Sequence, residues 1–343
     1  MKAAFLEGFG GPEALKVGEL PDPRPAAGQA LVRVRAAALN HLDLHVLAGN
    51  PAYKISLPHV LTGDMAGELV EAGPGTDLGA LKPGDRVLVA PGVSCWDCPP
   101  CSAGRDNLCR TYRILGADGG WGGMAELCVV PARNLVPLPP GMLWEQAAAV
   151  PLTFLTAFHM LDALARLKEG ETLLVMGASS GVGAAAIQLG KGVGARVIAA
   201  STAEEKLAAA RELGADETLL LGPAGLRPLR KLAPAGVDVV FEHVGGAYFP
   251  DLVRALAPGG RLVTCGATAG HDVTLDLRHV FFKELSVLGA KMGPQDELRR
   301  LMPAFASGRL RAVVDRIYPL AEARAALERL AARRQFGKVV IVP

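Results

Sequence analysis

The sequence has almost no excess of charge of either sign. Lys and Arg number 36 and Asp and Glu 34 in 343 residues, which gives a formal net charge of +2. Nucleic acids and anionic lipid surfaces select a basic patch or stripe, and no such run is visible in the sequence. Neither nucleic acid nor a membrane is therefore expected as a partner, and a small-molecule substrate is.

Long apolar runs are missing as well. The longest uncharged stretch, from Thr172 to Gly190, contains several glycines and serines and Gln188, so we reject it as a transmembrane helix. The segment Met1 to Glu7 has no apolar core of a secretory signal. We therefore expect a cytoplasmic protein whose cysteines are reduced.

Charged residues make up only 20% of the chain and hydrophobic residues 50%, which excludes disorder as the main state. The length is about twice that of an ordinary domain of roughly 150 residues, so two domains are expected. Gly 41 and Pro 25 indicate many tight turns. There is no internal repeat and no low-complexity segment.

The chain divides into two parts that differ in their pattern of apolar segments and turns. Short apolar segments separated by Gly and Pro turns fill the first 140 residues and are typical of an all-β barrel: Ala30–Ala36, Gly67–Ala72, Arg86–Ala90 and Ala125–Pro131. Glu145–Leu164 is expected to be helical with a break at Pro151. Six apolar strands alternating with helices such as Ala203–Leu213 and Tyr248–Leu256 then predict an α/β fold with a doubly wound parallel sheet. The predicted strands are Thr172–Met176, Arg196–Ala200, Glu217–Leu221, Asp238–Glu242, Arg261–Cys265 and Leu285–Gly289. From about Gly293 the pattern returns to helix, strand, helix, strand and ends in Lys338–Val342.

A glycine-rich turn follows the first of these strands. Gly181-x-Gly183-x-x-Ala186 has the spacing of a dinucleotide-binding turn, with Ala in place of the last Gly. One glycine permits the tight turn and the next lets the backbone approach a pyrophosphate. The alternative, a small-residue turn without a ligand, is less consistent with this position between a strand and a helix.

The end of the second strand bears on the choice of cofactor. An acidic residue there would bind both ribose hydroxyls of NAD, but the sequence has Ser201-Thr202 with Lys206 shortly after. Hydroxyls and a cation suit the 2′-phosphate of NADP, so NADP(H) is favoured over NAD(H). Glu204 and Glu205 oppose this preference.

Four of the six cysteines lie close together in the sequence. Cys95, Cys98, Cys101 and Cys109 form C-x2-C-x2-C-x7-C in a segment with little apolar content. Four thiolates complete the tetrahedral shell of a zinc ion and leave no open position, so the pattern predicts one structural zinc per chain. Cys128 and Cys265 fall in strand patterns and are interpreted as packing residues.

The barrel-like start, the cysteine lobe and the dinucleotide turn together resemble the medium-chain dehydrogenase/reductase superfamily of zinc alcohol dehydrogenases and quinone oxidoreductases. The resemblance covers essentially the whole chain and is carried by Gly63-Asp64-Met65-Ala66-Gly67, Lys82–Val87, the four cysteines, Gly181-Val182-Gly183, Leu213–Asp216, Leu256–Arg261 and Phe336–Val340. It implies a GroES-like catalytic domain over residues 1–148 and 292–343, with a zinc lobe at about 92–112. It also implies a Rossmann domain over residues 149–291, a cofactor cleft where the domains join, and a homodimer or homotetramer.

The sequence departs from the zinc alcohol dehydrogenases at the second, catalytic zinc. The positions of the expected Cys, His-Glu and Cys ligands look like Asn40, Asp64-Met65 and Leu152, which do not make a catalytic zinc site. The motifs around Asn40 and Leu152 instead look like those of the quinone oxidoreductases, which work without catalytic zinc but usually lack the cysteine lobe. We therefore expect NAD(P)H-dependent hydride transfer to a quinone, an enone or a related carbonyl compound.

The catalytic candidates are Asn40, which would orient or polarise the acceptor oxygen, Tyr53, which would donate a proton, and Asp64, which would position a partner. The predicted cofactor contacts are Thr156, Gly177, Ser179, Gly181, Val182, Gly183, Ser201, Thr202, Lys206, His243, Val244, Gly245, Gly266, Ala267 and Lys338. Two alternatives stay open: a zinc-dependent alcohol dehydrogenase with an atypical catalytic metal site, and a nucleotide-binding protein with little turnover.

Overall fold

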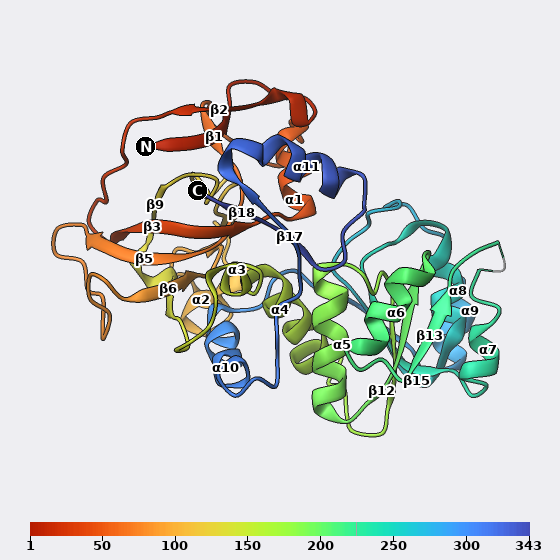
Figure 1. Ribbon diagram of the computed structural model, residues 1–343. Helices are drawn as coiled ribbons and strands as arrows, with labels where there is room; N and C mark the ends of the chain where they lie inside the picture. The colour runs from red at the N-terminus through yellow and green to blue at the C-terminus, as the bar shows by residue number, and fades with distance from the viewer. Residues whose placement is uncertain (224) are drawn as a thin grey trace. The chain divides into compact units, whose positions relative to one another are not determined.

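The computed structural model describes residues 1–223 and 225–343 of the chain (Figure 1). These residues form two compact units, one of residues 1–152 and 294–343 and the other of residues 153–293. In the described part of the chain, no helix is both long enough and apolar enough to cross a membrane.

The second unit is built on a parallel sheet of six strands. All six strands predicted between residues 172 and 289 are present, in the order β13-β12-β11-β14-β15-β16, and every neighbouring pair is parallel. This order, which turns back at β11, confirms the predicted doubly wound topology. The strands are β11 (Thr172–Val175), β12 (Arg196–Ser201), β13 (Glu217–Leu220), β14 (Val237–Glu242), β15 (Leu256–Thr264) and β16 (Ser286–Gly289).

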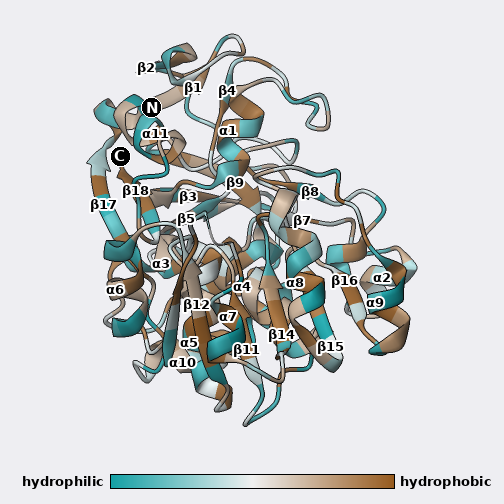
Figure 2. Ribbon diagram, turned by 90° about the vertical axis from the view of Figure 1, so that its right-hand side faces the viewer, coloured by the Kyte–Doolittle hydropathy of each residue, from teal (hydrophilic) through white to brown (hydrophobic). Residues whose placement is uncertain are grey.

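Both faces of this sheet are covered, which explains why its central strands are almost continuously apolar (Figure 2). On one face, Leu174 and Val240 belong to the same buried cluster as Leu252 of the covering helix. On the other face, Leu173 lies against Gly190, where an added Cβ would approach it to 2.7 Å. Because both faces are covered, the ends of the strands are where polar groups of the chain can contact a ligand.

The helices of this unit fill the connections between strands. The predicted helix over 145–164 is divided: α3 ends at Ala148, α4 begins at Pro151, and residues 159–164 form a π-helical turn. Proline at the first position of α4 begins a helix where it would break the interior of one. The helices are α4 (Pro151–Phe158), α5 (Gly181–Val193), α6 (Glu204–Glu212), α7 (Leu229–Leu232), α8 (Phe249–Ala255) and α9 (Leu277–Phe282).

The first unit is mainly β-structure. Its largest sheet has the order β10-β6-β5-β3-β18-β17, with β9 also paired to β3, and a second sheet has the order β2-β1-β4. Its strands are β1 (Lys2–Leu6), β2 (Leu15–Glu19), β3 (Gln29–Ala38), β4 (His59–Val60), β5 (Asp64–Ala72), β6 (Arg86–Val89), β7 (Gly92–Val93), β8 (Arg113–Ile114), β9 (Leu127–Pro131), β10 (Leu135–Pro137), β17 (Val314–Pro319) and β18 (Lys338–Val342). Its helices are α1 (His41–Leu47), α2 (Pro99–Ser102), α3 (Trp144–Ala148), α10 (Gln295–Ala306) and α11 (Ala323–Ala331).

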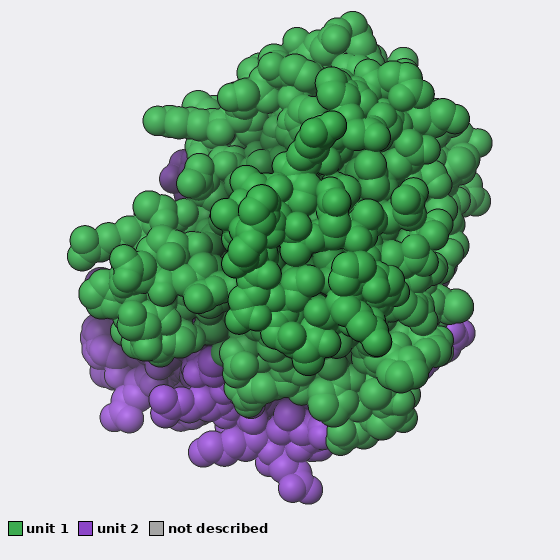
Figure 3. All heavy atoms as spheres, turned by 90° about the vertical axis from the view of Figure 1, so that its left-hand side faces the viewer, with its two compact units in different colours: residues 1–152, 294–343 green, residues 153–293 purple. Residues whose placement is uncertain are grey.

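Both ends of the chain belong to this unit, which is green in Figure 3. Strand β18 pairs antiparallel with β3, so that Ile341 lies opposite Ala37 and Val340 opposite Ala38. Strand β3 also pairs with β5. The last strand of the chain thereby holds the carboxyl end of β3 and the start of β5 in one sheet.

A buried carboxylate fixes the segment between β3 and β5. Asp43, in the first turn of α1, accepts a hydrogen bond from the Asn40 backbone N–H at 2.7 Å and one from the Thr62 N–H at 2.9 Å. Thr62 has φ +77°, a conformation that is strained for a β-branched residue and that these contacts help to hold. Asp43 is 2% exposed, and burial raises the pKa of its carboxyl to about 6.

This burial predicts a pH dependence of stability. A carboxyl whose pKa rises from 3.8 to about 6 on folding favours the folded state while it is protonated, and that contribution is lost as the pH rises through 6. The loss amounts to about 3 kcal/mol. We expect the free energy of unfolding of the wild type, relative to Asp43→Asn, to fall by about 2 kcal/mol between pH 4 and pH 7 in urea titrations, since the first part of the loss occurs below pH 4.

Asp77→Asn is the matched control, because Asp77 also accepts a backbone N–H but is exposed. A difference between the wild type and Asp43→Asn that stays constant or grows with pH would contradict the prediction.

Candidate functional site

The glycine-rich turn has the geometry that a dinucleotide needs. Gly177 follows β11 with φ +58°, and the chain then turns into α5. A Cβ on Gly183 would lie 2.4 Å from the Gly177 carbonyl oxygen, so helix and turn approach as closely as only glycine permits. The N-cap of α5, Ser180, accepts the Gly183 N–H at 2.9 Å. The remaining N–H groups of the first turn point outward from the helix end and suit an anionic group such as a pyrophosphate.

Three strand ends bring most of the predicted cofactor contacts together. Between β11 and α5 lie Gly177 and Ser179, and the first turn of α5 contains Gly181, Val182 and Gly183. After β14 come His243, Val244 and Gly245, and after β15 come Gly266 and Ala267. Because β14 pairs with both β11 and β15 in parallel, these three segments share the carboxyl edge of the sheet. This is the edge where doubly wound sheets bind ligands.

His243 lies directly over the glycine turn. Its Nε2 is 3.0 Å from the Ser180 Oγ, and a Cβ on Gly177 would meet its ring at 2.7 Å. Ser180 accepts the Gly183 N–H and can donate its own hydroxyl hydrogen to Nε2 when the ring proton of His243 lies on Nδ1. Burial lowers the pKa of His243, so the ring is neutral at pH 7.

Glu242 is a residue of this edge that the sequence analysis missed. It is fully buried; one carboxylate oxygen accepts the N–H groups of Val244 at 2.6 Å and Gly245 at 2.8 Å, and the other accepts the Thr264 hydroxyl at 3.0 Å. Gly245 has φ +68°, and a Cβ there would come within 2.3 Å of the Gly270 carbonyl oxygen. Glu242 therefore sets the path of the chain after β14. A single acidic residue at the end of an apolar strand gives no signal of this role.

The remaining contacts predicted in this unit have different surroundings. At the end of β12, Ser201 is buried and Thr202 exposed, and Lys206 is half-buried in the first turn of α6 next to the exposed Glu204 and Glu205. Thr156 in α4 is 4% exposed, and its hydroxyl has no hydrogen-bond partner among the described residues. A buried hydroxyl without a partner is a group that a ligand would satisfy. The glycine cradle and this hydroxyl fit a dinucleotide cofactor.

The first unit contains a buried polar cluster around Asp64. One carboxylate oxygen accepts the backbone N–H of Leu152 at 2.9 Å, and the other accepts the Asn40 Nδ2 at 2.9 Å and the Lys338 Nζ at 3.1 Å. Asp64 is completely buried and Lys338 is 4% exposed. Two of the positions matched to catalytic zinc ligands, Asn40 and Asp64, thus share one ammonium group, and Leu152 contacts only Asp64 through its backbone N–H.

Lys338 was predicted to contact the cofactor, and the structure gives its ammonium other partners. The Nζ donates to the Leu39 carbonyl oxygen at 2.6 Å and to the Asn40 Oδ1 at 2.6 Å, in addition to Asp64. Three acceptors use all three hydrogens of an ammonium, so none is left for a cofactor. Burial lowers the pKa of Lys338, while the neighbouring Asp64 and Asp43 oppose that change.

Tyr53, the predicted proton donor, has contacts with other residues than those of this cluster. Its ring packs half-buried against the core of the first unit, and its backbone N–H donates to the Asn50 carbonyl oxygen at 3.0 Å. Partial burial and the negative charge of Asp118 raise the pKa of the phenol. The hydroxyl therefore carries its proton at neutral pH, as a proton donor must.

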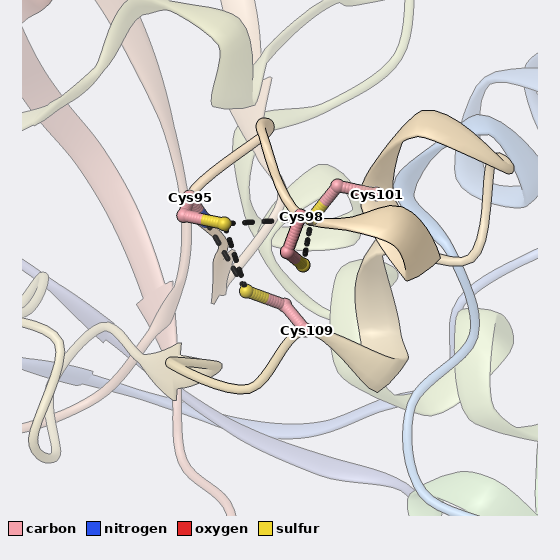
Figure 4. Close-up of side chains that lie close together, drawn as sticks. All are labelled: Cys95, Cys98, Cys101 and Cys109. Carbon is pink, nitrogen blue, oxygen red and sulfur yellow. Dashed lines mark hydrogen bonds between the residues drawn. The ribbon is translucent and has the colours of Figure 1, made fainter.

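The four cysteines come together at one point (Figure 4). Their sulfur atoms all lie within 4.8 Å of one another, and three of the pairs are 3.4, 3.5 and 4.0 Å apart. A tetrahedral zinc with Zn–S bonds of about 2.3 Å requires sulfurs about 3.8 Å apart, so the cluster fits the ion. The Cys95 N–H donates to the Cys109 sulfur at 3.3 Å, and such contacts lower the pKa of that thiol to about 6. Among the described residues, this is the one group of His, Cys, Asp or Glu side chains found with metal-binding spacing.

The cysteine lobe is anchored by a carboxylate that the sequence did not reveal. Asp106 is 5% exposed and accepts the Gln295 N–H at the start of α10 at 3.2 Å. A carboxylate at a helix N-terminus satisfies a free N–H and the helix dipole. The two residues are 189 positions apart, so no local pattern connects them. The other two cysteines, Cys128 and Cys265, are free thiols whose pKa burial raises to about 12, which is consistent with packing residues.

Family models match both parts of the chain. Residues 26–140 match the alcohol dehydrogenase GroES-like domain, and residues 181–307 match the zinc-binding dehydrogenase domain. Among solved structures, an NAD-dependent alcohol dehydrogenase is 43% identical and superposes with a TM-score of 0.95 over all of both chains.

Curated relatives include enzymes of different lengths. The acryloyl-coenzyme A reductase of Metallosphaera sedula is 30% identical over 342 residues, which is 99% of each chain. The spectinabilin polyketide synthase system protein NorB of Streptomyces orinoci is 35% identical over 330 residues, but the chain spans only 14% of its length. The chain belongs to the medium-chain dehydrogenase/reductase superfamily, in its zinc-type alcohol dehydrogenase group, and is an NAD(P)-dependent oxidoreductase.

Proposed function

We propose that this oxidoreductase reduces an electron-poor double bond or quinone with NAD(P)H and uses no catalytic metal. The observation that carries the proposal is the cluster of Asn40, Asp64 and Lys338. A metal ion there would have to compete with the Lys338 ammonium, whose Nζ already donates to the Asp64 carboxylate at 3.1 Å. An amide and one shared carboxylate also fall short of the three or so ligands that a catalytic zinc needs.

The substrate class follows from the absence of a Lewis acid in this mechanism. An isolated aldehyde or ketone needs strong polarisation before it accepts a hydride, whereas an enone or quinone is already electron-poor. The acryloyl-coenzyme A reductase among the relatives acts on a substrate of this kind, an α,β-unsaturated thioester. We therefore place such thioesters and simple enones ahead of quinones as substrates.

The residues of the glycine turn would hold a nicotinamide cofactor, which would supply the hydride that the β-carbon of the double bond takes up. The electron pair of the double bond then moves toward the carbonyl oxygen, and the α-carbon takes a proton to complete the saturated product. In the proposed mechanism the Asn40 Nδ2–H donates to that oxygen as its charge develops, and the protonated Tyr53 hydroxyl supplies the proton. The glycine turn, His243 and Glu242 hold the cofactor side of the reaction in place.

The four-cysteine site has a separate role in this proposal. Its residues would hold one structural zinc that organises residues 92–112 and, through Asp106, the start of α10. A closed sulfur shell has no open position for a substrate. The zinc-dependent alcohol dehydrogenase and the nucleotide-binding protein with little turnover remain the alternatives to the proposed function.

The test combines metal analysis with a substrate panel. We expect protein purified without added zinc to contain one zinc per chain and to oxidise NAD(P)H with acryloyl or crotonyl thioesters and enones, faster than with aldehydes. Two zinc ions per chain together with alcohol oxidation would instead support the zinc-dependent dehydrogenase. Tight NADPH binding without turnover of any compound would support the nucleotide-binding protein.

For the cofactor, we propose NADPH as the preferred form. The support is the Ser201 hydroxyl at the end of β12, where a carboxylate would favour NADH, and the Lys206 cation in the first turn of α6. The acidic Glu204 and Glu205 and the NAD-dependent alcohol dehydrogenase among the relatives favour the opposite choice. A substitution at Ser201 distinguishes a preference for NADPH from a preference for NADH.

We expect Ser201→Asp to lower the ratio of kcat/KM for NADPH to that for NADH by roughly tenfold or more, which corresponds to about 1.4 kcal/mol. A carboxylate at this point repels the 2′-phosphate and accepts both ribose hydroxyls. Ser307→Asp, at the exposed end of α10 in the first unit, is the control and leaves the ratio unchanged. A wild type that already prefers NADH would refute the proposed preference.

We also propose that the chain forms a homodimer or homotetramer. Strand β16 is an outer strand of the six-stranded sheet, and the helix before it in the sequence, α9, exposes large apolar side chains. Leu277 is 65%, Phe281 61% and Phe282 79% exposed, and Val287 in β16 is 41% exposed. Exposed apolar residues next to an unpaired strand edge mark a surface that another chain covers.

Light scattering tests this proposal. We expect the wild type to have two or four times the chain mass of 35.7 kDa and Phe282→Asp to shift it toward the monomer, because the carboxylate would be buried in the interface. Leu220→Asp is the matched control, since Leu220 is exposed on β13 at the opposite edge of the same sheet. A monomeric wild type, or equal effects of both variants, would contradict it.

A further inference from the structure

We propose that Lys338 is a positioning residue for the reaction: its buried ammonium fixes the Asn40 carboxamide so that the NH2 edge is presented to the acceptor oxygen. The inference rests on the proposed function and adds a role that the family resemblance did not give to Lys338. It replaces the predicted cofactor contact of this lysine with an action through Asn40.

The orientation of the Asn40 side chain is determined by its neighbours. Its Oδ1 accepts from the Lys338 Nζ at 2.6 Å, and its Nδ2 donates to the Asp64 carboxylate at 2.9 Å. The flipped amide would place NH2 against an ammonium and an oxygen against a carboxylate, so both contacts would become repulsive. The ion pair therefore selects one of the two amide orientations.

One hydrogen of the Asn40 amide makes only a long, weak hydrogen bond, which an acceptor oxygen of the substrate could replace. The second contact of Nδ2, to the Ala38 carbonyl oxygen, is 3.4 Å long, beyond the usual range of a strong hydrogen bond. Asp64 and Lys338 are buried, whereas Asn40 is half-exposed at the start of α1. Of these three side chains, the amide is the one that a substrate can reach.

The ammonium also changes the chemistry of the amide. A positive charge bound to the carbonyl oxygen draws electron density from the amide nitrogen and makes its N–H a stronger donor. The effect is larger in a buried, low-dielectric site than in water. In this way a fixed cation takes part of the role that a Lewis acid plays elsewhere, without touching the substrate.

The anchoring of Lys338 itself explains why it stays in place. Its third donor is used by the Leu39 carbonyl oxygen at 2.6 Å, one residue before Asn40. Lys338 is the first residue of β18, which pairs with β3 immediately before this segment. Backbone pairing and side-chain contacts therefore hold the same short stretch of chain from two directions.

A double-mutant cycle between Lys338→Met and Asn40→Ala tests the proposal. We expect each single variant to lower kcat for an enone substrate roughly 10²-fold, the loss typical for one donor to a developing oxyanion. The double variant should lose no more than either single variant, because Lys338 acts through Asn40. The dissociation constant for NADPH should stay the same in all three variants.

A lysine with a purely structural role or a cofactor role gives other results. Weaker NADPH binding with unchanged kcat in Lys338→Met would show a cofactor contact and overturn the proposal, and so would losses that multiply in the double variant. Lys191→Met is the matched control, because Lys191 also pairs with an aspartate, Asp216 at 2.8 Å, but near the surface of the second unit. It should leave kcat unchanged.

Two further measurements guard against misfolding and against failure of the proposed function. If Lys338→Met alone does not fold, the double variant Asp64→Asn with Lys338→Met is used, because it removes both buried charges. This double variant should fold and should still show the loss of kcat. The side-chain amide resonance of Asn40, identified by its absence in Asn40→Ala, reports the contact by NMR without any substrate. It should shift in Lys338→Met; an unchanged resonance would overturn the proposal even if no substrate of the panel were reduced.

Discussion

The ion pair between Asp64 and Lys338 is the interaction on which the first unit depends. It joins residues 274 positions apart, at the start of β5 and the start of β18, inside a region with almost no access to water. Breaking such a pair by removing one partner costs about 3–5 kcal/mol, because a lone charge stays buried. Two apolar residues could pack there without that cost, and in our proposal the pair serves to fix the position of Asn40 and of the chain around it.

In the second unit, backbone geometry fixes the turns at the sheet edge, whereas in the first unit a buried ion pair fixes the chain around Asn40. Glycines with positive φ at positions 177 and 245 let the turns after β11 and β14 approach other backbone closely, and the Glu242 carboxylate ties down the second of these turns. His243 is held between them by Ser180. Hydrogen bonds therefore hold the carboxyl edge of the sheet, which is where we predict the cofactor to bind.

The sequence predicted those parts of the structure that depend on neighbours along the chain. The six strands, the helices after them and the close spacing of Cys95, Cys98 and Cys101 follow from local periodicity and spacing, and each is present. The cofactor role of Lys338 was predicted from a motif at the end of the chain, and the contacts of its ammonium do not support it. Glu242 and Asp106 were missed, since a single acidic residue becomes significant only when its partners are known.

The sequence by itself determined the α/β class, the glycine turn, the four-cysteine cluster and the residue types at positions 40, 64 and 152, which are an amide, a carboxylate and an alkyl chain. These are properties of residue type and spacing over short distances, where the chain has little freedom. Only the tertiary structure decided which charge neutralises Asp64, how the Asn40 amide is turned and what anchors the cysteine lobe to α10. The physical reason is that burial and pairing between residues about 190 to 300 positions apart depend on the complete packing of the unit, which no local pattern encodes.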